Sequence, residues 1–332
     1  MARGILKRIL GQNSKLLDDD DFYALGGDSL AVVEAVCELR RADFPASVHL
    51  FATTGRIGDL LSDLEHKLCV INEDHFSLDK SKPTNHRRVS TKNKGESLIP
   101  GLQFHLVVSD WIVEPGNTDS LGMEQVVTYV VDCFLKRDKI TKAFNLTKRV
   151  LNTVVNSYVA SHLKQPGLIL VANSTHVSKP LGIVIALPSS QMPVVPVADP
   201  CWESFENLME LCASCNDSNL DNGSELSILM LAADSANEHE DLDSGESGRL
   251  VMETLATLER TVINRATALG YGNITTVNTN PVTQAICAEL GYRQKNAVSL
   301  AEFSSGNYAS RVMIPKEYHD VTCYFMIKQL IE

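Results

Sequence analysis

The stretch Asp21-Phe-Tyr-Ala-Leu-Gly-Gly-Asp-Ser-Leu30 links two segments of helical periodicity near the start of the chain. Apolar side chains recur at helical spacing over Ile5–Leu10, and again along one face of Leu30–Arg40. The two consecutive glycines indicate a tight turn, and the Asp-Ser pair after them stands where a helix would begin. A third helix is expected over Ile57–Leu68, so this part of the chain is predicted to be a small helical bundle.

A second stretch, Leu50-Phe-Ala-Thr-Thr-Gly-Arg-Ile-Gly-Asp-Leu60, follows at the start of the third expected helix. Together the two stretches resemble the peptidyl carrier domains of nonribosomal peptide synthetases, a small four-helix type of bundle, and the second stretch resembles the third-helix region of that family. In that family a serine at the position of Ser29 carries 4′-phosphopantetheine. The resemblance therefore implies this cofactor on Ser29 and a phosphopantetheinyl transferase as a partner. The alternative is that Ser29 only caps its helix, which would not require the flanking motif.

The chain has 332 residues, enough for about two domains. It has 30 Lys and Arg against 41 Asp and Glu, and the net charge of −11 argues against nucleic acid as a partner. Its apolar runs are too short to cross a membrane and no secretory signal opens it, so we expect a cytoplasmic monomer. Most of its eight cysteines are expected to be free thiols, and the Cys212–Cys215 pair is too isolated to indicate a metal site.

Composition divides the chain into three parts. Residues 71–100 are polar and locally basic with few core formers, which is typical of a linker. The carrier domain is then predicted at 1–70 and a second domain at 101–332. The basic strip in the linker is either a solvated face or a docking surface.

Short apolar runs alternate with helical segments after the linker. Gly167–Asn173 and Leu181–Leu187 are divided by turn residues, which predicts an antiparallel pair of strands. A long helix is expected over about Gly248–Leu269, and Gly270 would end it. This order predicts an α/β domain with a mixed central sheet. The other expected strands are Leu102–Val113, Glu225–Ala233, Asn273–Asn278 and Val321–Ile327, and the other expected helices are Ser120–Leu135, Phe144–Leu163 and Pro281–Leu290.

The same order, which ends in Asn280-Pro-Val-Thr-Gln-Ala-Ile-Cys-Ala-Glu-Leu-Gly-Tyr292, resembles the GCN5-related N-acetyltransferase superfamily over residues 101–332. Phe134-Leu-Lys-Arg-Asp-Lys139 and the Leu-Gly-Tyr ending more narrowly resemble the insect arylalkylamine N-acyltransferases. A carrier followed by such a domain is similar to the C-terminal part of insect synthetases that join β-alanine to biogenic amines. An adenylation domain precedes the carrier in those enzymes, so we expect that partner outside this chain.

This resemblance implies roles for particular residues. A glutamate base of the arylalkylamine acyltransferases corresponds to Asp138, and the tyrosine acid of many superfamily members corresponds to Cys287. Asp138 either accepts the proton of the amine, directly or through water, or is only a helix-terminal surface carboxylate; Tyr292 is expected to pack. The strands are expected to splay at Leu229–Ala233 and Thr276–Asn278 and to bind the pantetheine arm there. The groove residues implied are Leu231, Ala232, Ala233, Val277 and Asn278.

The loop Asp234–Gly248 departs from the superfamily pattern. The superfamily binds the pyrophosphate of coenzyme A there on a glycine-rich turn, whereas this loop has six acidic residues and no Lys or Arg. Carboxylates within a Debye length of about 8 Å would repel the phosphates. We therefore expect weak binding of free coenzyme A and a donor that arrives on the carrier. The alternative is an acidic loop that folds away from the groove.

We interpret the chain as a carrier and an acyltransferase that move an aminoacyl group, β-alanyl, from Ser29-linked phosphopantetheine to a small-molecule amine such as dopamine or histamine. No metal is expected. Two alternatives stay open: an acyltransferase that uses free acyl-coenzyme A, and a noncatalytic carrier-docking module. Affinity for coenzyme A tests the first alternative, and amide formation from a loaded carrier tests the second.

Overall fold

The computed structural model describes the chain except for residues 13, 77–94, 99–104, 112–121, 165–166, 175–179, 215–223, 235–243, 307–311 and 331–332. It divides into two compact units. The first combines Met1–Val107 with Ser235–Glu253, and the second combines Val108–Asp234 with Thr254–Glu332. Among the described residues, no helix has both the length and the apolar character that crossing a membrane requires.

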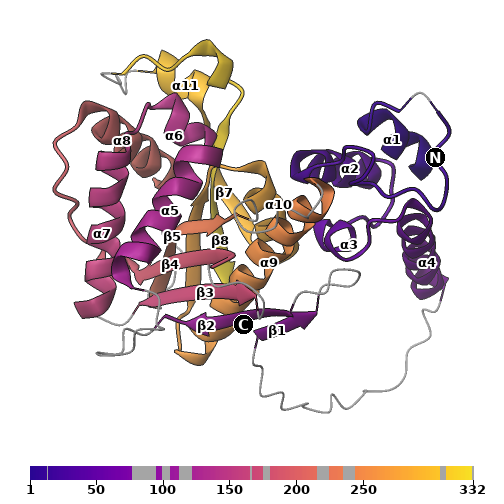
Figure 1. Cartoon of the computed structure of the whole chain (residues 1–332), viewed down its shortest axis with the longest axis horizontal. Coiled ribbons are helices and arrows are strands. Elements are labelled where there is room, and N and C mark those ends of the chain that lie inside the picture. Colours follow the sequence, from indigo (N-terminus) through magenta and orange to yellow (C-terminus); the bar gives the residue numbers. More distant parts are fainter. Residues whose placement is uncertain are drawn as a thin grey trace. The chain divides into compact units, whose positions relative to one another are not determined.

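The first unit contains the helical bundle predicted from the sequence. Its helices are α1 (Ala2–Ile9), α2 (Ser29–Arg41), α3 (Val48–Thr53) and α4 (Ile57–Phe76), labelled in Figure 1. Their apolar faces meet in a core in which Leu6, Phe22 and Leu39 are fully buried. The apolar spacing did not indicate the short α3, which lies at the stretch that resembles the third-helix region of carrier domains. Helix α4 continues to Phe76, six residues into the segment predicted as a linker, and most of the basic strip lies outside the described residues.

The second unit is built on a mixed sheet. Its strands follow the order β2-β3-β4-β5-β6-β8-β7. The predicted antiparallel pairing of β3 with β4 is confirmed, β5 and β6 are parallel, and β6, β8 and β7 are antiparallel neighbours. Strand β1 (Gly95–Leu98) belongs to the first unit. The strands of the sheet are β2 (His105–Asp110), β3 (Leu168–Ser174), β4 (Gly182–Pro188), β5 (Glu225–Ala233), β6 (Asn273–Asn278), β7 (Arg293–Ser299) and β8 (Thr322–Gln329).

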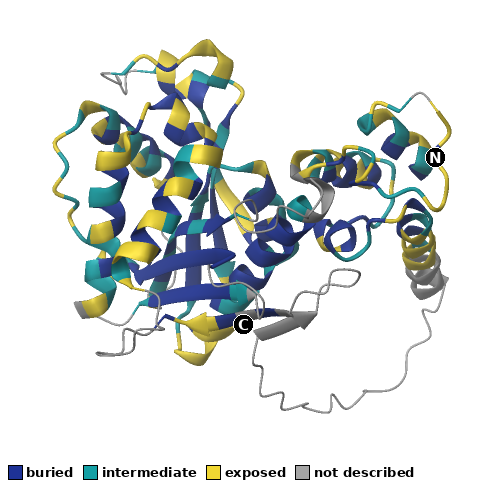
Figure 2. Cartoon of the chain, in the orientation of Figure 1, coloured by how far each residue is buried: buried dark blue, intermediate teal, exposed yellow. Residues whose placement is uncertain are grey.

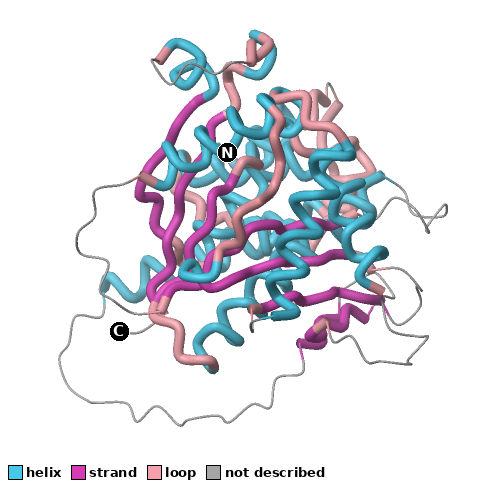
Figure 3. The backbone as a smooth tube through the Cα atoms, turned by 90° about the vertical axis from the view of Figure 1, so that its left-hand side faces the viewer, coloured by secondary structure: helices cyan, strands magenta, loops and turns pink. Residues whose placement is uncertain are grey.

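Helices cover both faces of this sheet, as Figure 3 shows. Ile183 and Ile185 of β4 pack into the core shared with α5 (Met123–Arg137) and α7 (Lys148–Lys164). Gly182 points to the other face, where a Cβ would lie only 2.6 Å from Thr254 of α9 (Ser244–Ala268). Strand β4 is therefore buried along its whole length (Figure 2). The remaining helices are α6 (Lys139–Ala143), α8 (Pro200–Ala213), α10 (Pro281–Glu289) and α11 (Leu300–Ser305), with short 3₁₀ turns at Ser189–Gln191 and Lys316–Tyr318.

Three differences from the sequence prediction have local causes. Helix α7 begins at Lys148 and not at Phe144, because Asn145 has a φ of 51° and interrupts the helical backbone. Helix α8 was missed although Asp199 caps it and a proline follows at its first position, which is a recognised start signal. Strand β7 was missed because it is a largely exposed edge strand. It pairs with β8, so β8 lies between β6 and β7 and is not at the edge of the sheet.

Candidate functional site

The turn that leads to Ser29 is held by close packing on Phe22. A Cβ on Gly27 would lie 2.3 Å from the Phe22 ring, so only glycine fits there, and Gly26 has a φ of +97°. Asp28 accepts a hydrogen bond from the Ala31 amide at 2.8 Å and caps α2. Ser29 is therefore the first residue of α2 and not its cap, so the capping alternative is wrong.

Hydrogen bonds fix the rest of this turn. Asp21 accepts hydrogen bonds from the amides of Tyr23 and Ala24, at 2.8 and 3.1 Å. The Tyr23 hydroxyl donates to the Phe51 carbonyl at 2.9 Å, and the rings of Phe22 and Phe51 meet edge to face. The flanking residues of the motif thus have structural roles that hold the start of α2 in one place.

The central strands of the second unit separate halfway along their length. Strands β5 and β6 pair only over Glu225–Ile228 and Asn273–Thr276, although β5 continues to Ala233 and β6 to Asn278. On their outer sides β5 stays paired with β4, and β6 with β8, to the ends of both strands. The main-chain N–H and C=O groups that face this opening do not bond to the neighbouring strand, so they can form hydrogen bonds with another molecule. An extended molecule with amide groups can pair with such strand edges.

A bulge marks the point of separation. The register of β4 with β5 shifts between Ile185 and Ala186, so Leu229 is the extra residue on β5. Of the predicted groove residues, Leu231 and Val277 are half-buried, whereas Ala232, Ala233 and Asn278 are buried. All five lie on the separated halves of the two strands.

The side chain of Asn278 is buried and makes its contacts inside the protein. Its amide nitrogen lies 3.3 Å from both Cys287 Sγ and Met326 Sδ. Its main-chain carbonyl accepts a hydrogen bond from Gln284 at 3.0 Å. Asn278 therefore shapes the wall of the opening and does not offer its side chain to a ligand.

Asp138 lies at the open end of the separated strands. Its Oδ1 accepts a hydrogen bond from the hydroxyl of Thr279, the residue after β6, at 2.9 Å. Its Oδ2 accepts from both the amide and the hydroxyl of Thr141, each at 2.7 Å, and so caps α6. Asp138 is only 9% exposed, so the prediction of a surface carboxylate is wrong. Thr279, which sequence reasoning missed, is half-buried beside it.

A second buried carboxylate, Glu259 of α9, lies near the other side of β6. It accepts a hydrogen bond from the Tyr292 hydroxyl at 2.5 Å, and it also interacts with the thiol of Cys287. Burial raises the pKa of Glu259 from 4.5 to about 7 and also raises the pKa of Tyr292 and Cys287. Tyr292 packs as predicted. Glu259 occupies an apolar helix face beside Leu255 and Val262, a spacing that would have marked it as buried.

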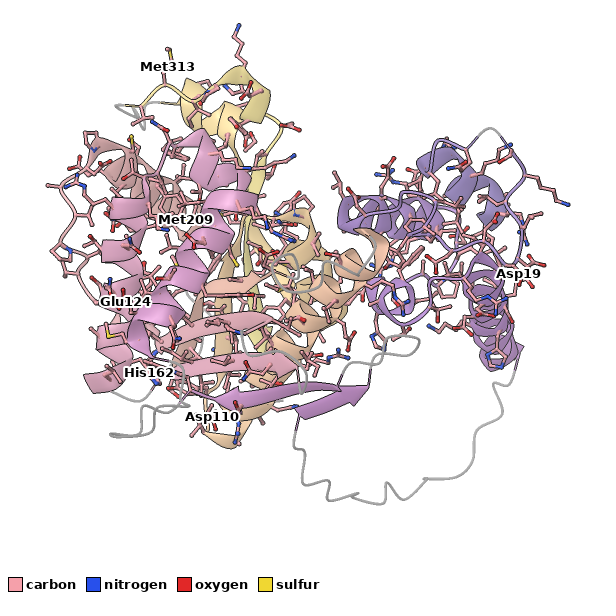
Figure 4. All side chains as sticks on the ribbon, in the orientation of Figure 1. Asp19, Asp110, Glu124, His162, Met209 and Met313 are labelled. Atoms are coloured by element: carbon pink, nitrogen blue, oxygen red, sulfur yellow. The ribbon has the colours of Figure 1, made fainter. Side chains whose placement is uncertain are left out.

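A third titratable group, His162, lies elsewhere. Figure 4 labels His162 close to Asp110, the last residue of β2, whereas Asp138 caps α6, which Figure 1 labels at the opposite end of the second unit. The His162 ring lies 6.1 Å from the Trp111 ring, and burial lowers the pKa of its imidazole. It cannot serve the opening between β5 and β6.

The first residue of the acidic loop is neutralised. Asp234 forms ion pairs with Lys136 at 3.0 Å and with Arg137 at 2.5 Å, and its side chain is only 8% exposed. Its main-chain N–H donates a hydrogen bond to the Tyr129 hydroxyl at 2.9 Å. Counting Asp234 among the carboxylates that would repel a phosphate was therefore wrong. The other five acidic side chains lie outside the described residues, so weak binding of coenzyme A stays a prediction.

Comparisons with known proteins match the N-terminal residues to a family and the whole chain to a relative. Residues 2–64 match the family model described as "Phosphopantetheine attachment site". The chain is 24% identical over 373 aligned positions to a β-alanyl-bioamine nonribosomal peptide synthetase of Schistosoma mansoni. That match covers 99% of this chain and 30% of the relative, so the chain spans less than a third of the relative's length. The first unit is thus a phosphopantetheine carrier, as the motif indicates.

Two solved structures share the mixed-sheet fold. The C-terminal condensation domain of Ebony, in complex with β-alanyl-dopamine, superposes with a TM-score of 0.54 at 14% identity, over 68% of this chain and 99% of that domain. An arylalkylamine N-acetyltransferase 7 of the mosquito Aedes aegypti gives a TM-score of 0.51 at 17% identity, over 68% of this chain and 88% of that protein. The predicted fold class, a carrier bundle followed by an acetyltransferase-like mixed sheet, is confirmed.

Proposed function

We propose that the chain transfers a β-alanyl group from a phosphopantetheine thioester on Ser29 to a biogenic arylalkylamine and forms an amide. The observation that carries this proposal is the combination, in one chain, of a carrier motif and an acyltransferase fold whose central strands separate. The name of the Schistosoma relative and the β-alanyl-dopamine bound to the Ebony domain support this acyl group and this class of amine.

The first unit fits the cofactor. Phosphopantetheine attached to Ser29 would supply the thiol that holds the acyl group as a thioester. Ser29 is the first residue of the 13-residue helix α2, where main-chain amides have no helical acceptor and favour a phosphate group. The Gly26–Gly27 turn has no side chains of its own and would leave room for a modifying enzyme. A phosphopantetheinyl transferase and an upstream adenylation domain would be the partners that modify and load the carrier.

The separated strands fit the extended arm. Main-chain groups along Leu231–Ala233 and Val277 line the opening, and amide groups of a pantetheine arm would pair with them as a strand does. The bulge at Leu229 redirects β5 at the point where the pairing ends. This arrangement would hold the thioester at the open end, where Asp138 and Thr279 lie.

Proton transfer is assigned to Asp138. Amide formation joins the amine nitrogen to the acyl carbon and releases the thiol, so one proton leaves the nitrogen and one reaches the sulfur. The Thr279 hydroxyl, half-buried and hydrogen-bonded to Asp138, would take the amine proton while it gives its own to the carboxylate. Asp138 then returns a proton to the sulfur. The two bonds from Thr141 hold the carboxylate in one orientation.

The proposal is tested on the full chain by intact mass spectrometry. A phosphopantetheinyl transferase and β-alanyl-coenzyme A should add β-alanyl-phosphopantetheine to the wild type, and an arylalkylamine should then remove the β-alanyl group as an amide. Ser29→Ala should block both steps. The matched control is Ser62→Ala, which removes an exposed serine of α4 in the same unit and should change neither step.

Three results would contradict the proposal. If Ser29→Ala still gains the adduct, the attachment residue is wrong. If the loaded chain keeps its β-alanyl group with every arylalkylamine, the chain is a noncatalytic carrier module. If Ser29→Ala forms the amide from β-alanyl-coenzyme A as fast as the loaded wild type, free coenzyme A thioester is the donor.

A further inference from the structure

The junction of α5 and α6, in the second unit, contacts both sides of the opening between β5 and β6. On one side Lys136 and Arg137 form ion pairs, at 3.0 and 2.5 Å, with Asp234, the residue after β5. On the other side Asp138 accepts a hydrogen bond at 2.9 Å from Thr279, the residue after β6. Because β5 and β6 are parallel, Asp234 and Thr279 follow the same ends of the two strands. The three consecutive junction residues, called here the bridging segment, therefore join the two strand ends across the opening.

Asp234 is held from several directions. Its main-chain N–H donates to the Tyr129 hydroxyl of α5 at 2.9 Å and to the carbonyl of Leu181, just before β4, at 3.2 Å. Lys136 and Arg137 lie in the last turn of α5, where the helix dipole favours positive charge. A single exposed ion pair contributes little to stability, but here two cations converge on a carboxylate that is only 8% exposed. Asp234 therefore fixes the end of α5 against the end of β5.

The end of β6 is held on its outer side by Gln284 of α10. The Nε2 group of Gln284 donates to the Asn278 carbonyl at 3.0 Å and to the carbonyl of Thr322, the first residue of β8, at 2.9 Å. One side-chain amide has two N–H groups, so it can serve both carbonyls. Asn278 precedes Thr279 directly, so this contact also fixes where the Thr279 main chain begins. The bridging segment thus joins two strand ends that are each attached to an outer neighbour.

We propose that Asp234 is a positioning residue for acyl transfer, because its ion pairs hold the bridging segment so that Asp138 stays against Thr279. The inference rests on the proposed function, in which these two residues move the proton of the amine. Asp138 follows Arg137 directly in the chain, so a shift of the ion-paired residues moves the Asp138 main chain with them. A reacting group that is misplaced by about 1 Å can cost a factor of about 10² in rate. Asp234 acts through Asp138 and does not touch the reacting atoms.

The test begins with single-turnover amide formation by the full chain, loaded with β-alanyl-phosphopantetheine and given a saturating arylalkylamine. Asp234→Asn should slow the reaction about tenfold to a hundredfold, because the bridging segment loses its charged anchor. Asp234→Glu keeps the charge and should recover part of the rate. The matched control is Asp132→Asn, which breaks a different ion pair of α5, with Lys148 of α7, and should keep the wild-type rate. A wild-type rate in Asp234→Asn would overturn the proposal.

A double-mutant cycle with Asp138→Asn separates positioning from general support of the fold. Two changes that act through the same group are not additive, so Asp234→Asn should change the rate of the Asp138→Asn chain by less than about twofold. A residue that only stabilises the fold would slow both chains by the same factor, and that result would overturn the positioning role. If Asp234→Asn does not fold, the pair Lys136→Gln and Arg137→Gln removes the same ion pairs at partly exposed positions and completes the cycle in its place.

Hydrogen exchange tests the bridging segment without relying on amide formation. The Thr141 amide donates to Asp138 at 2.7 Å, so its exchange reports whether the carboxylate stays in place. Exchange should become faster in Asp234→Asn and not in Asp132→Asn. If the wild type makes no amide while this exchange result holds, the proposed function fails and the structural role of Asp234 stands. If exchange is the same in all three chains, Asp234 does not position Asp138 and the inference is wrong.

Discussion

Two buried carboxylates in the second unit show how surroundings decide what an acid can do. Asp138, at the α5–α6 junction, accepts three hydrogen bonds from Thr141 and Thr279 and lies at the open end of the separated strands. Glu259, inside α9, is 1% exposed and has the Tyr292 hydroxyl and the Cys287 thiol as its polar neighbours. An apolar enclosure favours the neutral form of an acid such as Glu259, whereas both carboxylate oxygens of Asp138 are engaged by hydrogen-bond donors.

The difference assigns separate tasks to the two groups. Asp138 is connected through Thr279 to the side of the opening where an amine can approach, so it is the candidate for proton transfer. Glu259 contacts the buried Tyr292 and Cys287, and the Cys287 thiol meets the buried side chain of Asn278, so among the described residues its contacts lead into the interior and not to the open end. Glu259 is therefore expected to affect the stability of the fold and its dependence on pH, and not the chemical step. Three variants test this contrast, in decreasing order of their expected effect on the rate.

Asp138→Asn should have the largest effect on the rate. Loss of a general base typically costs a factor of about 10²–10⁴, and part of the rate should return at high pH, where the amine is already neutral. The asparagine NH₂ would also face a hydrogen-bond donor of Thr141 or Thr279, so the free energy of unfolding should fall by about 1–3 kcal/mol. The measurements are single-turnover rates over pH 6–9 and urea unfolding.

The control is Asp132→Asn, which makes the same charge change at a half-exposed aspartate paired with Lys148 on the surface. It should leave the rate and the stability close to those of the wild type. A rate for Asp138→Asn that matches this control at every pH would remove Asp138 from proton transfer and leave positioning of the amine as the source of catalysis.

Thr279→Val should have an intermediate effect. The change keeps the shape of the side chain but removes the hydroxyl that links Asp138 to the opening, and it should slow the reaction by about tenfold. Thr279→Ser keeps the hydroxyl and should restore most of the rate. If valine and serine variants react equally fast, the proton reaches Asp138 by another route, such as water.

Glu259→Gln should leave the rate close to that of the wild type and change how stability depends on pH. Burial raises the pKa of Glu259 from 4.5 to about 7, so the native state keeps a proton that the unfolded chain has lost. Stability of the wild type should therefore fall as pH rises from 4.5 to about 7, by about 3 kcal/mol, and then stay level. Urea unfolding across this range should lack that fall in the glutamine variant. A rate loss in Glu259→Gln as large as in Asp138→Asn would refute the contrast.

Sequence reasoning reached the fold more fully than the site. It found the carrier turn and the long helix α9 because glycine pairs, capping residues and apolar spacing act over a few neighbouring residues. It named Asp138 through family resemblance but took it for a possible surface group, since nothing in its own stretch of sequence indicates burial. It missed Thr279, because its neighbours in sequence say nothing about its partner. For Glu259, an acid on an apolar helix face was the one local sign available.

The sequence by itself determined the two kinds of architecture, a helical carrier bundle and a mixed-sheet acyltransferase fold, and the turn that presents Ser29. Tertiary structure alone decided which side chains meet. Thr279 binds Asp138 from 141 residues away, and Lys136 binds Asp234 across 98 residues. Helix and turn preferences come from contacts between near neighbours, whereas these pairs form only when packing brings distant segments together and buries their polar groups, which must then find partners.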